Sequence, residues 1–156
     1  MIKVSRVTDY GIVLLAHLAG CENGSTHNAR EVAEKTSLPQ PMVSKILKSL
    51  AREGLLLSHR GSKGGYSLGR HPEEISVPEI IAALEGPIAL TECATHAGAC
   101  RQETRCHVRE PWQRINQVVR NALAEITLAD LAVSEVTASL LPLASLRVDT
   151  SDILER

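Results

Sequence analysis

Residues 28–54 read N-A-R-E-V-A-E-K-T-S-L-P-Q-P-M-V-S-K-I-L-K-S-L-A-R-E-G, and this stretch decides the fold that the sequence predicts. Asn28 is suited to cap a short helix over residues 29–35, with Glu31 placed to complete a capping box. Two prolines then mark the start of a second helix that ends at Gly54, since proline is tolerated in a first helical turn. A short helix, a tight turn and a longer helix together predict a helix-turn-helix.

The second of these helices has two distinct faces. Its apolar residues recur at intervals of three and four and form one stripe: Val43, Ile46, Leu47 and Leu50. The opposite face is polar and basic, with Gln40, Ser44, Lys45 and Lys48. The second helix of a helix-turn-helix lies in the major groove of DNA, so we expect these four polar residues to contact DNA. The alternative is an ordinary surface helix whose lysines are merely solvated.

The next segment favours the DNA-binding interpretation. Residues 55–58 and 66–68 are short β-prone runs around a glycine-rich basic tip, which predicts a β-hairpin. A hairpin at this place is the wing of a winged helix, and its tip can bring Arg60 and Lys63 to phosphates or into a minor groove. The tip lacks the spacing of a nucleotide-binding phosphate loop, so we discount that function.

Composition and charge agree with a helical DNA-binding protein. The chain of 156 residues has one Trp, two Tyr and no Phe, so its core must be aliphatic, which favours packed helices over a β-sandwich. Residues 1–70 carry ten Lys/Arg against five Asp/Glu, whereas residues 71–156 carry seven against thirteen. A basic amino-terminal half is the pattern expected of a nucleic-acid-binding face.

The compartment follows from what the sequence lacks. The first residues carry charges, and no uncharged apolar run approaches the roughly 18 residues needed to span a membrane. We therefore expect a cytoplasmic protein with no membrane partner. No small-molecule substrate is expected of a DNA-binding regulator. In a reducing cytosol, closely spaced cysteines indicate metal or redox chemistry rather than structural disulfides.

A longer helix is expected from Pro111 through about Glu125, preceded by a shorter one over residues 77–84. The long helix has apolar residues at helical spacing: Trp112, Ile115, Val118, Val119, Ala122 and Leu123. Pairing with the same helix of a second subunit would bury that stripe, so we expect a homodimer. A brief helix over residues 128–133 and a partly ordered tail over residues 134–156 complete the predicted chain.

Three of the four cysteines lie between these helices, at Cys93, Cys100 and Cys106, together with His96 and His107. Three thiolates suit an iron–sulfur cluster or zinc. The paired C-x2-4-C or H-x3-5-H spacings of closed zinc sites are absent, which favours a labile cluster. The C-x-x-C motif of catalytic dithiols is absent too, so we expect a regulator and not an enzyme.

With these features in place, the sequence resembles the IscR/NsrR family of bacterial winged-helix regulators (the Rrf-two superfamily). The matching pieces are T-D-Y-G at residues 8–11, R-G and G-G-Y at residues 60–66, P-E-I and L-E at residues 78–85, the three cysteines, and T-L-A-D-L at residues 127–131. Residues 85–93, E-G-P-I-A-L-T-E-C, look most like the branch that regulates the SUF machinery for cluster assembly.

The resemblance implies a homodimer that binds a pseudo-palindromic operator and holds an iron–sulfur cluster on Cys93, Cys100 and Cys106, with [2Fe–2S] favoured over [4Fe–4S]. It also implies base contacts from Ser44 and Lys45 and a minor-groove contact from Arg60. The function expected is a transcriptional regulator, most simply a repressor, that senses the cluster and controls cluster-assembly genes. A nitric-oxide-sensing repressor of the same family and a winged-helix regulator with structural zinc are the alternatives.

The chain departs from the family pattern at the fourth ligand. Regulators of the IscR type place a histidine three residues after the last cysteine, where this chain has Arg109. The candidates for a fourth ligand are His107, which adjoins Cys106, Asp9 of the partner subunit, and His96.

The sequence therefore predicts a mainly α protein in four parts. Residues 1–86 form a winged helix-turn-helix domain and residues 87–110 a cluster-binding loop. Residues 111–133 form the dimerisation helix with a short terminal helix, and residues 134–156 form the tail.

Overall fold

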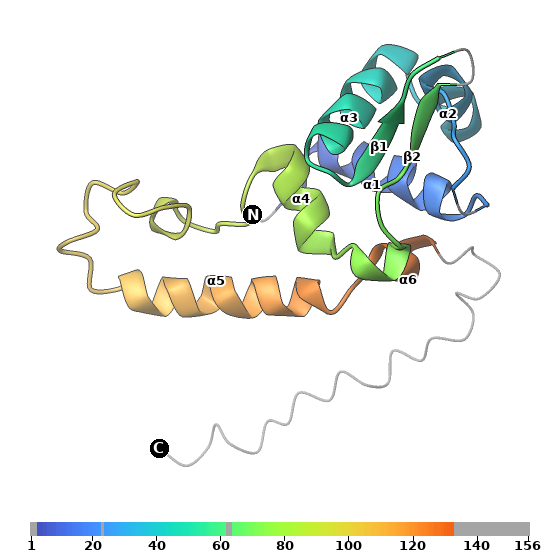
Figure 1. Ribbon diagram of the computed structural model, residues 1–156. Coiled ribbons are helices and arrows are strands. Elements are labelled where there is room, and N and C mark those ends of the chain that lie inside the picture. Colours follow the sequence, from blue (N-terminus) through green and yellow to red (C-terminus); the bar gives the residue numbers. More distant parts are fainter. Residues whose placement is uncertain (1–2, 23, 62–63, 133–156) are drawn as a thin grey trace.

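The structure, a computed structural model, describes residues 3–132 except residues 23, 62 and 63. Figure 1 shows a bundle of helices with a small hairpin on one side and a long helix, α5, that extends away from the bundle. The prediction of a mainly helical winged-helix protein is confirmed. The predicted tail over residues 134–156 lies outside the described residues.

The helix-turn-helix forms where the sequence predicts it. Its first helix, α2 (Ala29–Thr36), begins with the Asn28 side chain accepting a hydrogen bond from the Glu31 backbone N–H. Its second helix, α3 (Gln40–Arg52), begins after Pro39 and carries a second proline in its first turn. The turn between them uses a left-handed residue, Ser37, with φ 56°.

The first helix of the chain, α1 (Arg6–Ala19), lies behind the helix-turn-helix and begins at a cap formed by Ser5. Its inward residues and the apolar stripe of α3 form a single aliphatic core, as the shortage of aromatic residues requires. The largest fully buried side chains on these two helices are Leu14, Leu15, Val43, Ile46, Leu47 and Leu50. Every residue of the predicted α3 stripe is buried.

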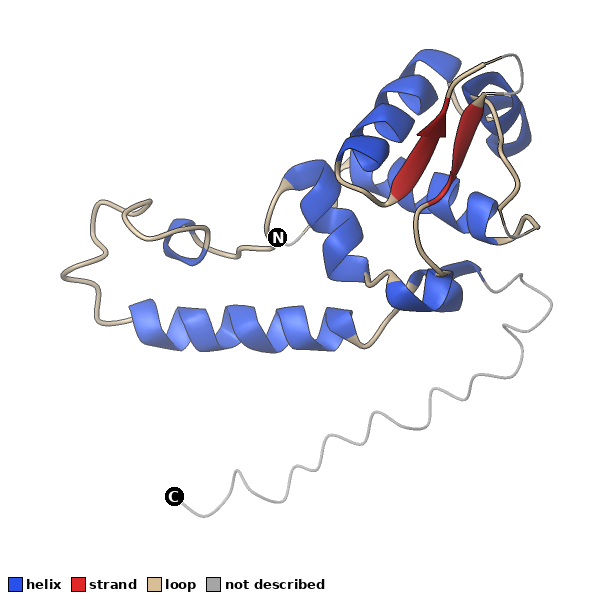
Figure 2. Cartoon of the chain, in the orientation of Figure 1, coloured by secondary structure: helices blue, strands red, loops and turns tan. Residues whose placement is uncertain are grey.

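The wing is a two-stranded antiparallel hairpin, coloured red in Figure 2, made of β1 (Leu56–His59) and β2 (Gly65–Leu68). Its register pairs Leu56 with Leu68 and His59 with Gly65, so β1 starts one residue later than the sequence indicates. The hairpin is also tied to the segment before α2, which the sequence does not reveal. The backbones of His27 and Tyr66 exchange two hydrogen bonds, of 3.0 and 2.8 Å.

That extra pairing requires a glycine at position 65. A Cβ on Gly65 would lie 2.4 Å from the carbonyl oxygen of His27 and 2.9 Å from the backbone nitrogen of Asn28. Both are backbone atoms and cannot rotate away, so only a residue without a side chain allows β2 to approach this closely. The wing is thereby positioned against the start of α2.

The chain then turns through a short 3-10 helix, η1 (Pro72–Glu74), into α4 (Val77–Glu85). Ser76 and Glu79 form a capping box at the start of α4, and Gly86 ends it with φ 92°, a conformation that favours glycine. These are the boundaries that the sequence indicates, with one more residue at the carboxyl end. The cysteine loop begins directly after Gly86.

The long helix, α5 (Arg109–Ala124), begins two residues before the predicted Pro111, which is therefore in its first turn. A further 3-10 helix, η2 (Glu92–Ala94), lies in the loop before it. After α5 the chain returns to the bundle through α6 (Leu128–Ala132), which packs against α1. Leu128 is completely buried in the core, so the residues after the long helix complete the winged-helix unit.

Two backbone contacts hold α6 in this place. The Leu128 N–H donates to the Ile75 carbonyl oxygen at 2.7 Å, and the Val77 N–H donates to the Ile126 carbonyl oxygen at 3.0 Å. None of the helices that the structure describes is long and apolar enough to cross a membrane.

Candidate nucleic-acid interface and cysteine loop

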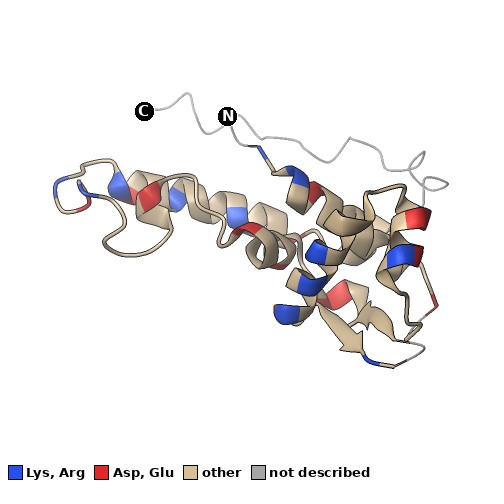
Figure 3. Ribbon diagram, turned by 90° about the horizontal axis from the view of Figure 1, so that it is seen from above, with Lys and Arg blue, Asp and Glu red and all other residues tan. Residues whose placement is uncertain are grey.

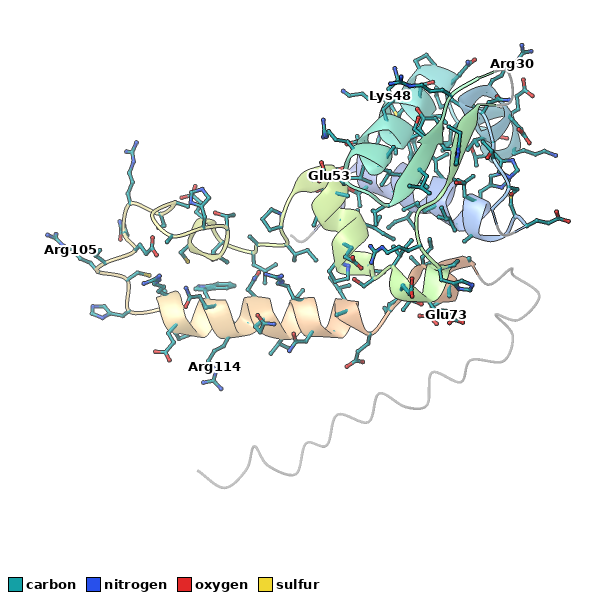
Figure 4. All side chains as sticks on the ribbon, viewed as in Figure 1. Arg30, Lys48, Glu53, Glu73, Arg105 and Arg114 are labelled. Atoms are coloured by element: carbon teal, nitrogen blue, oxygen red, sulfur yellow. The ribbon has the colours of Figure 1, made fainter. Side chains whose placement is uncertain are left out.

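The outer face of α3 presents the side chains that the sequence assigns to DNA. Gln40, Lys45 and Lys48 are exposed, and Ser44 is half-buried beside them. Figure 4 shows Lys48 directed away from the body of the protein. The helix can point these groups outward because its stripe of four aliphatic residues, on the opposite side, is packed into the core.

Figure 3 shows basic positions following one another along α3, beside the hairpin. Within the described part of the chain, neither Lys45 nor Lys48 has a carboxylate within 4 Å, whereas Arg52 pairs with Glu53 at 3.1 Å. Two unpaired ammonium groups on an exposed helix face are available to phosphates. The face therefore has the charge that DNA binding needs.

A hollow between α1 and α3 adjoins these lysines, and the sequence does not indicate it. It has a volume of about 970 Å³ and is lined in part by the apolar residues Val7, Met42 and Leu84. An apolar surface next to basic groups resembles what a recognition helix offers to base edges, where thymine methyl groups are read by apolar contact. Val7 and Met42 are exposed apolar residues outside the helical stripes, which is the only hint of the hollow that the sequence could have offered.

The wing would supply the second part of the candidate interface. Arg60 directly follows β1 and is exposed, which suits a contact with phosphate or a minor groove. Gly61, with φ 108°, then begins the tip. The other wing residue that the sequence assigns to DNA, Lys63, lies outside the described residues.

The cysteine loop leaves α4 and runs beside α5 to the amino-terminal end of that helix, which is the end away from the winged-helix bundle (Figure 1). Its three cysteines, Cys93, Cys100 and Cys106, are free thiols and half-buried. In residues 3–132, leaving aside 23, 62 and 63, no three Cys, His, Asp or Glu side chains lie close enough together to hold a metal ion. The structure thus places the three thiols in one loop without gathering them at one point.

The candidates for a fourth ligand are all accessible. Asp9 is exposed in the first turn of α1, and His107 is exposed next to Cys106. His96 is exposed as well, and its Nδ1 lies 3.2 Å from the carbonyl oxygen of Ala97. The fourth cysteine, Cys21, lies apart from the loop, after α1, where its thiol donates to the His17 carbonyl oxygen at 3.3 Å and burial raises its pKa.

An ion pair between Glu103 and Arg109 joins the second half of the cysteine loop to α5. Glu103, with only 11% of its side chain exposed, pairs with Arg109 of α5 at 2.5 Å. The other oxygen of its carboxylate accepts a hydrogen bond from the backbone N–H of Gly98. Glu103 therefore ties the turn after Cys93 to the first turn of α5. These two contacts could not be predicted from the sequence, because the residues that Glu103 joins are five and six positions away from it.

The carboxylate of Glu85 joins the start of α1 to the end of α4, just before the cysteine loop. Glu85, the last residue of α4, accepts hydrogen bonds from the Ser5 backbone N–H at 3.0 Å and from the buried Thr8 hydroxyl. The hydrogen bonds from Thr8 and then Ser5 hold the pKa of Glu85 below its ordinary value. Helix α1 and the base of the cysteine loop are thus mechanically connected.

A helix-turn-helix with a basic outer face, followed by a hairpin seated against it, defines a winged-helix DNA-binding protein. The Rrf2 family profile, described as an iron-dependent transcriptional regulator, matches residues 4–134. The chain belongs to the Rrf2 family of transcriptional regulators, whose members bind DNA and are typically dimers.

The chain is similar to the HTH-type transcriptional regulator CymR of Bacillus subtilis strain 168, with 32% identity over 83% of this chain and 89% of that protein. The solved structure of B. subtilis CymR, named the global cysteine regulator, matches with a TM-score of 0.65 over 85% of this chain and 97% of that chain. The solved T. potens IscR matches with a TM-score of 0.62 and 28% identity, over 83% of this chain and 85% of that chain.

These matches confirm the prediction of a DNA-binding transcriptional regulator rather than an enzyme. They show the Rrf2 family, towards which the resemblance to IscR and NsrR pointed, and they agree with the winged-helix class. The cluster ligands, the base-reading residues and the branch within the family stay predictions.

Proposed function

We propose that the protein is an iron–sulfur-sensing transcriptional regulator that acts as a homodimer and represses genes for SUF-type cluster assembly. The observation that carries the proposal is the concentration of three free thiols in one loop, at residues 93, 100 and 106, beside the long helix of a winged-helix regulator. The relatedness to a family described as iron-dependent supports it.

The donor set fits an iron–sulfur cluster. Thiolates are the ligands that such clusters use, and Cys93, Cys100 and Cys106 would hold it, with one of His107, Asp9 of the partner subunit and His96 as the fourth ligand. When bound, the cluster would supply a group that reacts with oxidants or nitric oxide and that is lost when iron is short. A cluster with one ligand that is not a thiolate suits a sensor, because loss of the group is then the signal.

The apolar face of α5 supports the homodimer. Trp112, Ile115 and Val118 remain 40%, 46% and 66% exposed in the single chain. An amphipathic helix whose apolar side faces water is unfavourable by about 25 cal/mol for each Å² left uncovered. A second copy of the same helix covers both stripes at once, as a two-fold interface requires.

The connection from the loop to DNA runs through packed elements. The loop contacts α5, α5 leads into α6, α6 packs against α1, and α1 packs against α3. The Glu85 carboxylate adds a direct connection between the base of the loop and the start of α1. A loop that closes when its cysteines share a cluster, and relaxes without it, would shift α3 relative to its groove in DNA.

The test compares protein purified without oxygen, protein freed of metal by a chelator, and the triple variant Cys93→Ala, Cys100→Ala, Cys106→Ala. Iron, acid-labile sulfide and zinc are counted per chain, and binding to the DNA upstream of the protein's own gene is measured at about 150 mM salt, because phosphate contacts depend strongly on salt. We expect reddish-brown protein with iron and sulfide, and an affinity that changes when the metal is removed.

Three results would contradict parts of the proposal. Colourless protein with one zinc per chain would establish the structural-zinc alternative. Equal operator affinity of the loaded and metal-free forms would refute sensing. If nitric oxide releases the protein from DNA, but oxygen and iron shortage do not, the protein is the nitric-oxide sensor instead of the cluster-assembly regulator.

A further inference from the structure

Helix α5 carries a buried amide on a helix whose apolar residues are exposed. Asn116 is only 6% exposed, and it is the single buried residue of α5. Its helical neighbour Ile115 is 46% exposed. Asparagine is ordinarily a surface residue and is rarely buried without a specific hydrogen-bonding task. The burial of Asn116 therefore points to such a task.

Both ends of this amide are used, and both reach the same segment of the cysteine loop. Asn116 Oδ1 accepts a hydrogen bond from the Leu90 N–H at 3.0 Å, and Asn116 Nδ2 donates to the Ile88 carbonyl oxygen at 3.2 Å. The side chain thus pairs with the backbone of residues 88–90 as a neighbouring strand would. It brings together positions that are 26 and 28 residues apart in the sequence.

The segment held by Asn116 leads directly to the first cysteine. Thr91 follows it, and the Thr91 hydroxyl lies 3.2 Å from the sulfur of Cys93. The Thr91 carbonyl oxygen accepts a hydrogen bond from the Ala94 N–H at 3.0 Å and so begins the 3-10 turn that contains Cys93. Cys93 and Asn116 also line the same hollow of about 340 Å³ beside α5.

We propose that Asn116 is a positioning residue that fixes Cys93 against α5 and makes the helix respond to the state of the cysteine loop. The positioning half of this proposal stands on the contacts alone, and the response of the helix rests on the proposed function. Because residues 88–90 form the entry to the loop, releasing them frees Cys93 from the helix. The backbone hydrogen bonds from the Glu103 N–H to the Cys100 carbonyl oxygen and from the Arg109 N–H to the Cys106 carbonyl oxygen are left in place.

The test uses the full chain with Asn116→Ala, and Asn121→Ala as the matched control on the same helix. Asn121 is exposed and bonds to Gln117 at the surface, so the control makes the same chemical change without touching the loop. Alanine is the better helix former at both positions, so neither change weakens α5 itself. Circular dichroism and thermal unfolding establish that both variants fold.

The first measurement is made on reduced, metal-free protein. For Asn116→Ala we expect amide hydrogen exchange in peptides covering residues 88–91 to rise about fivefold or more, the effect of losing one backbone hydrogen bond. Alkylation of Cys93 should accelerate by a similar factor relative to Cys21, which serves as the internal reference outside the loop. Exchange and alkylation rates equal to those of the parent protein and of Asn121→Ala would overturn the positioning role.

The second measurement is made on protein that holds its cluster. We expect Asn116→Ala to reduce the ratio of operator affinities between loaded and metal-free protein, and Asn121→Ala to leave the ratio unchanged. An unchanged ratio in Asn116→Ala would overturn the response of the helix. If the parent protein takes up no iron and sulfide, the proposed function fails, and the exchange and alkylation measurements still decide whether Asn116 positions Cys93.

Discussion

Replacing Gly65 by alanine tests how the wing is seated against the helix-turn-helix. A methyl group at this position would lie 2.4 Å from the His27 carbonyl oxygen and 2.6 Å from the carbonyl carbon behind it. Neither atom belongs to a side chain that can rotate, so β2 must move away from residue 27. The movement breaks the two backbone hydrogen bonds between His27 and Tyr66.

The expected cost follows from these two effects. Two backbone hydrogen bonds contribute about 1 kcal/mol each, and an extra methyl group forced into a packed contact costs about 1–3 kcal/mol. Because the shift that relieves the contact also breaks the bonds, we expect the free energy of unfolding to fall by about 2–4 kcal/mol. A domain of ordinary stability, about 5–15 kcal/mol, still folds after such a loss.

The measurement is urea unfolding of the Gly65→Ala variant, followed by titration with operator DNA under conditions in which it is folded. We expect weaker DNA binding as well, because the displaced hairpin carries Arg60 away from the outer face of α3. Gly20→Ala is the matched control: its Cβ would lie 3.5 Å from the nearest atom, an ordinary contact, and φ there is −79°. If Gly65→Ala unfolds within about 0.5 kcal/mol of the control, the seating of the wing described above is wrong.

Three further changes test other contacts. Leu128→Ala should lower the free energy of unfolding by about 2–5 kcal/mol, since Leu128 is fully buried. The control, Leu131→Ala, should lower it far less, because Leu131 is 37% exposed. Equal effects would mean that α6 does not complete the core. Glu85→Gln should cost about 1 kcal/mol at pH 7, because charged hydrogen bonds are worth about 1.5–3 kcal/mol when buried and less at an exposed site. The lowered pKa of Glu85 means that this stabilisation is present above its ordinary value of 4.5 and is lost as the pH falls through the lowered pKa, so the stabilities of parent and variant should converge as the pH falls below that ordinary value. Lys48→Gln should weaken binding to any duplex and reduce the slope of log affinity against log salt by about 1 for each chain, whereas an unchanged slope would remove Lys48 from the interface.

Much of the local structure at the candidate interface could be predicted from the sequence because its signals are local. The burial of Val43 and Leu47 and the exposure of Lys45 and Lys48 follow from the helical period alone. The cap at Asn28 involves residues three positions apart, so a sequence shows it directly. The candidate cluster ligands were likewise visible, because cysteines are few and their spacing is informative.

The contacts that join distant segments could not be predicted in the same way. The periodicity of α5 indicates an apolar stripe, yet the one residue that the single chain buries there is Asn116, which reads as polar surface. Its partners lie 26 and 28 residues earlier, and no local pattern connects an amide on a helix with a backbone segment in a loop. The pairing of His27 with Tyr66 was hidden for the same reason.

The sequence by itself determined the helix-turn-helix, the hairpin, the long amphipathic helix and the family, because each depends on residues that are neighbours along the chain or on motifs that can be compared directly. Only the tertiary structure decided that α6 returns to complete the core with Leu128, that Gly65 seats the wing, and that Asn116 holds the entry to the cysteine loop. The physical reason is that burial and hydrogen-bond pairing between distant segments are set by how the elements pack together, and local periodicity carries no information about which partner each face will meet.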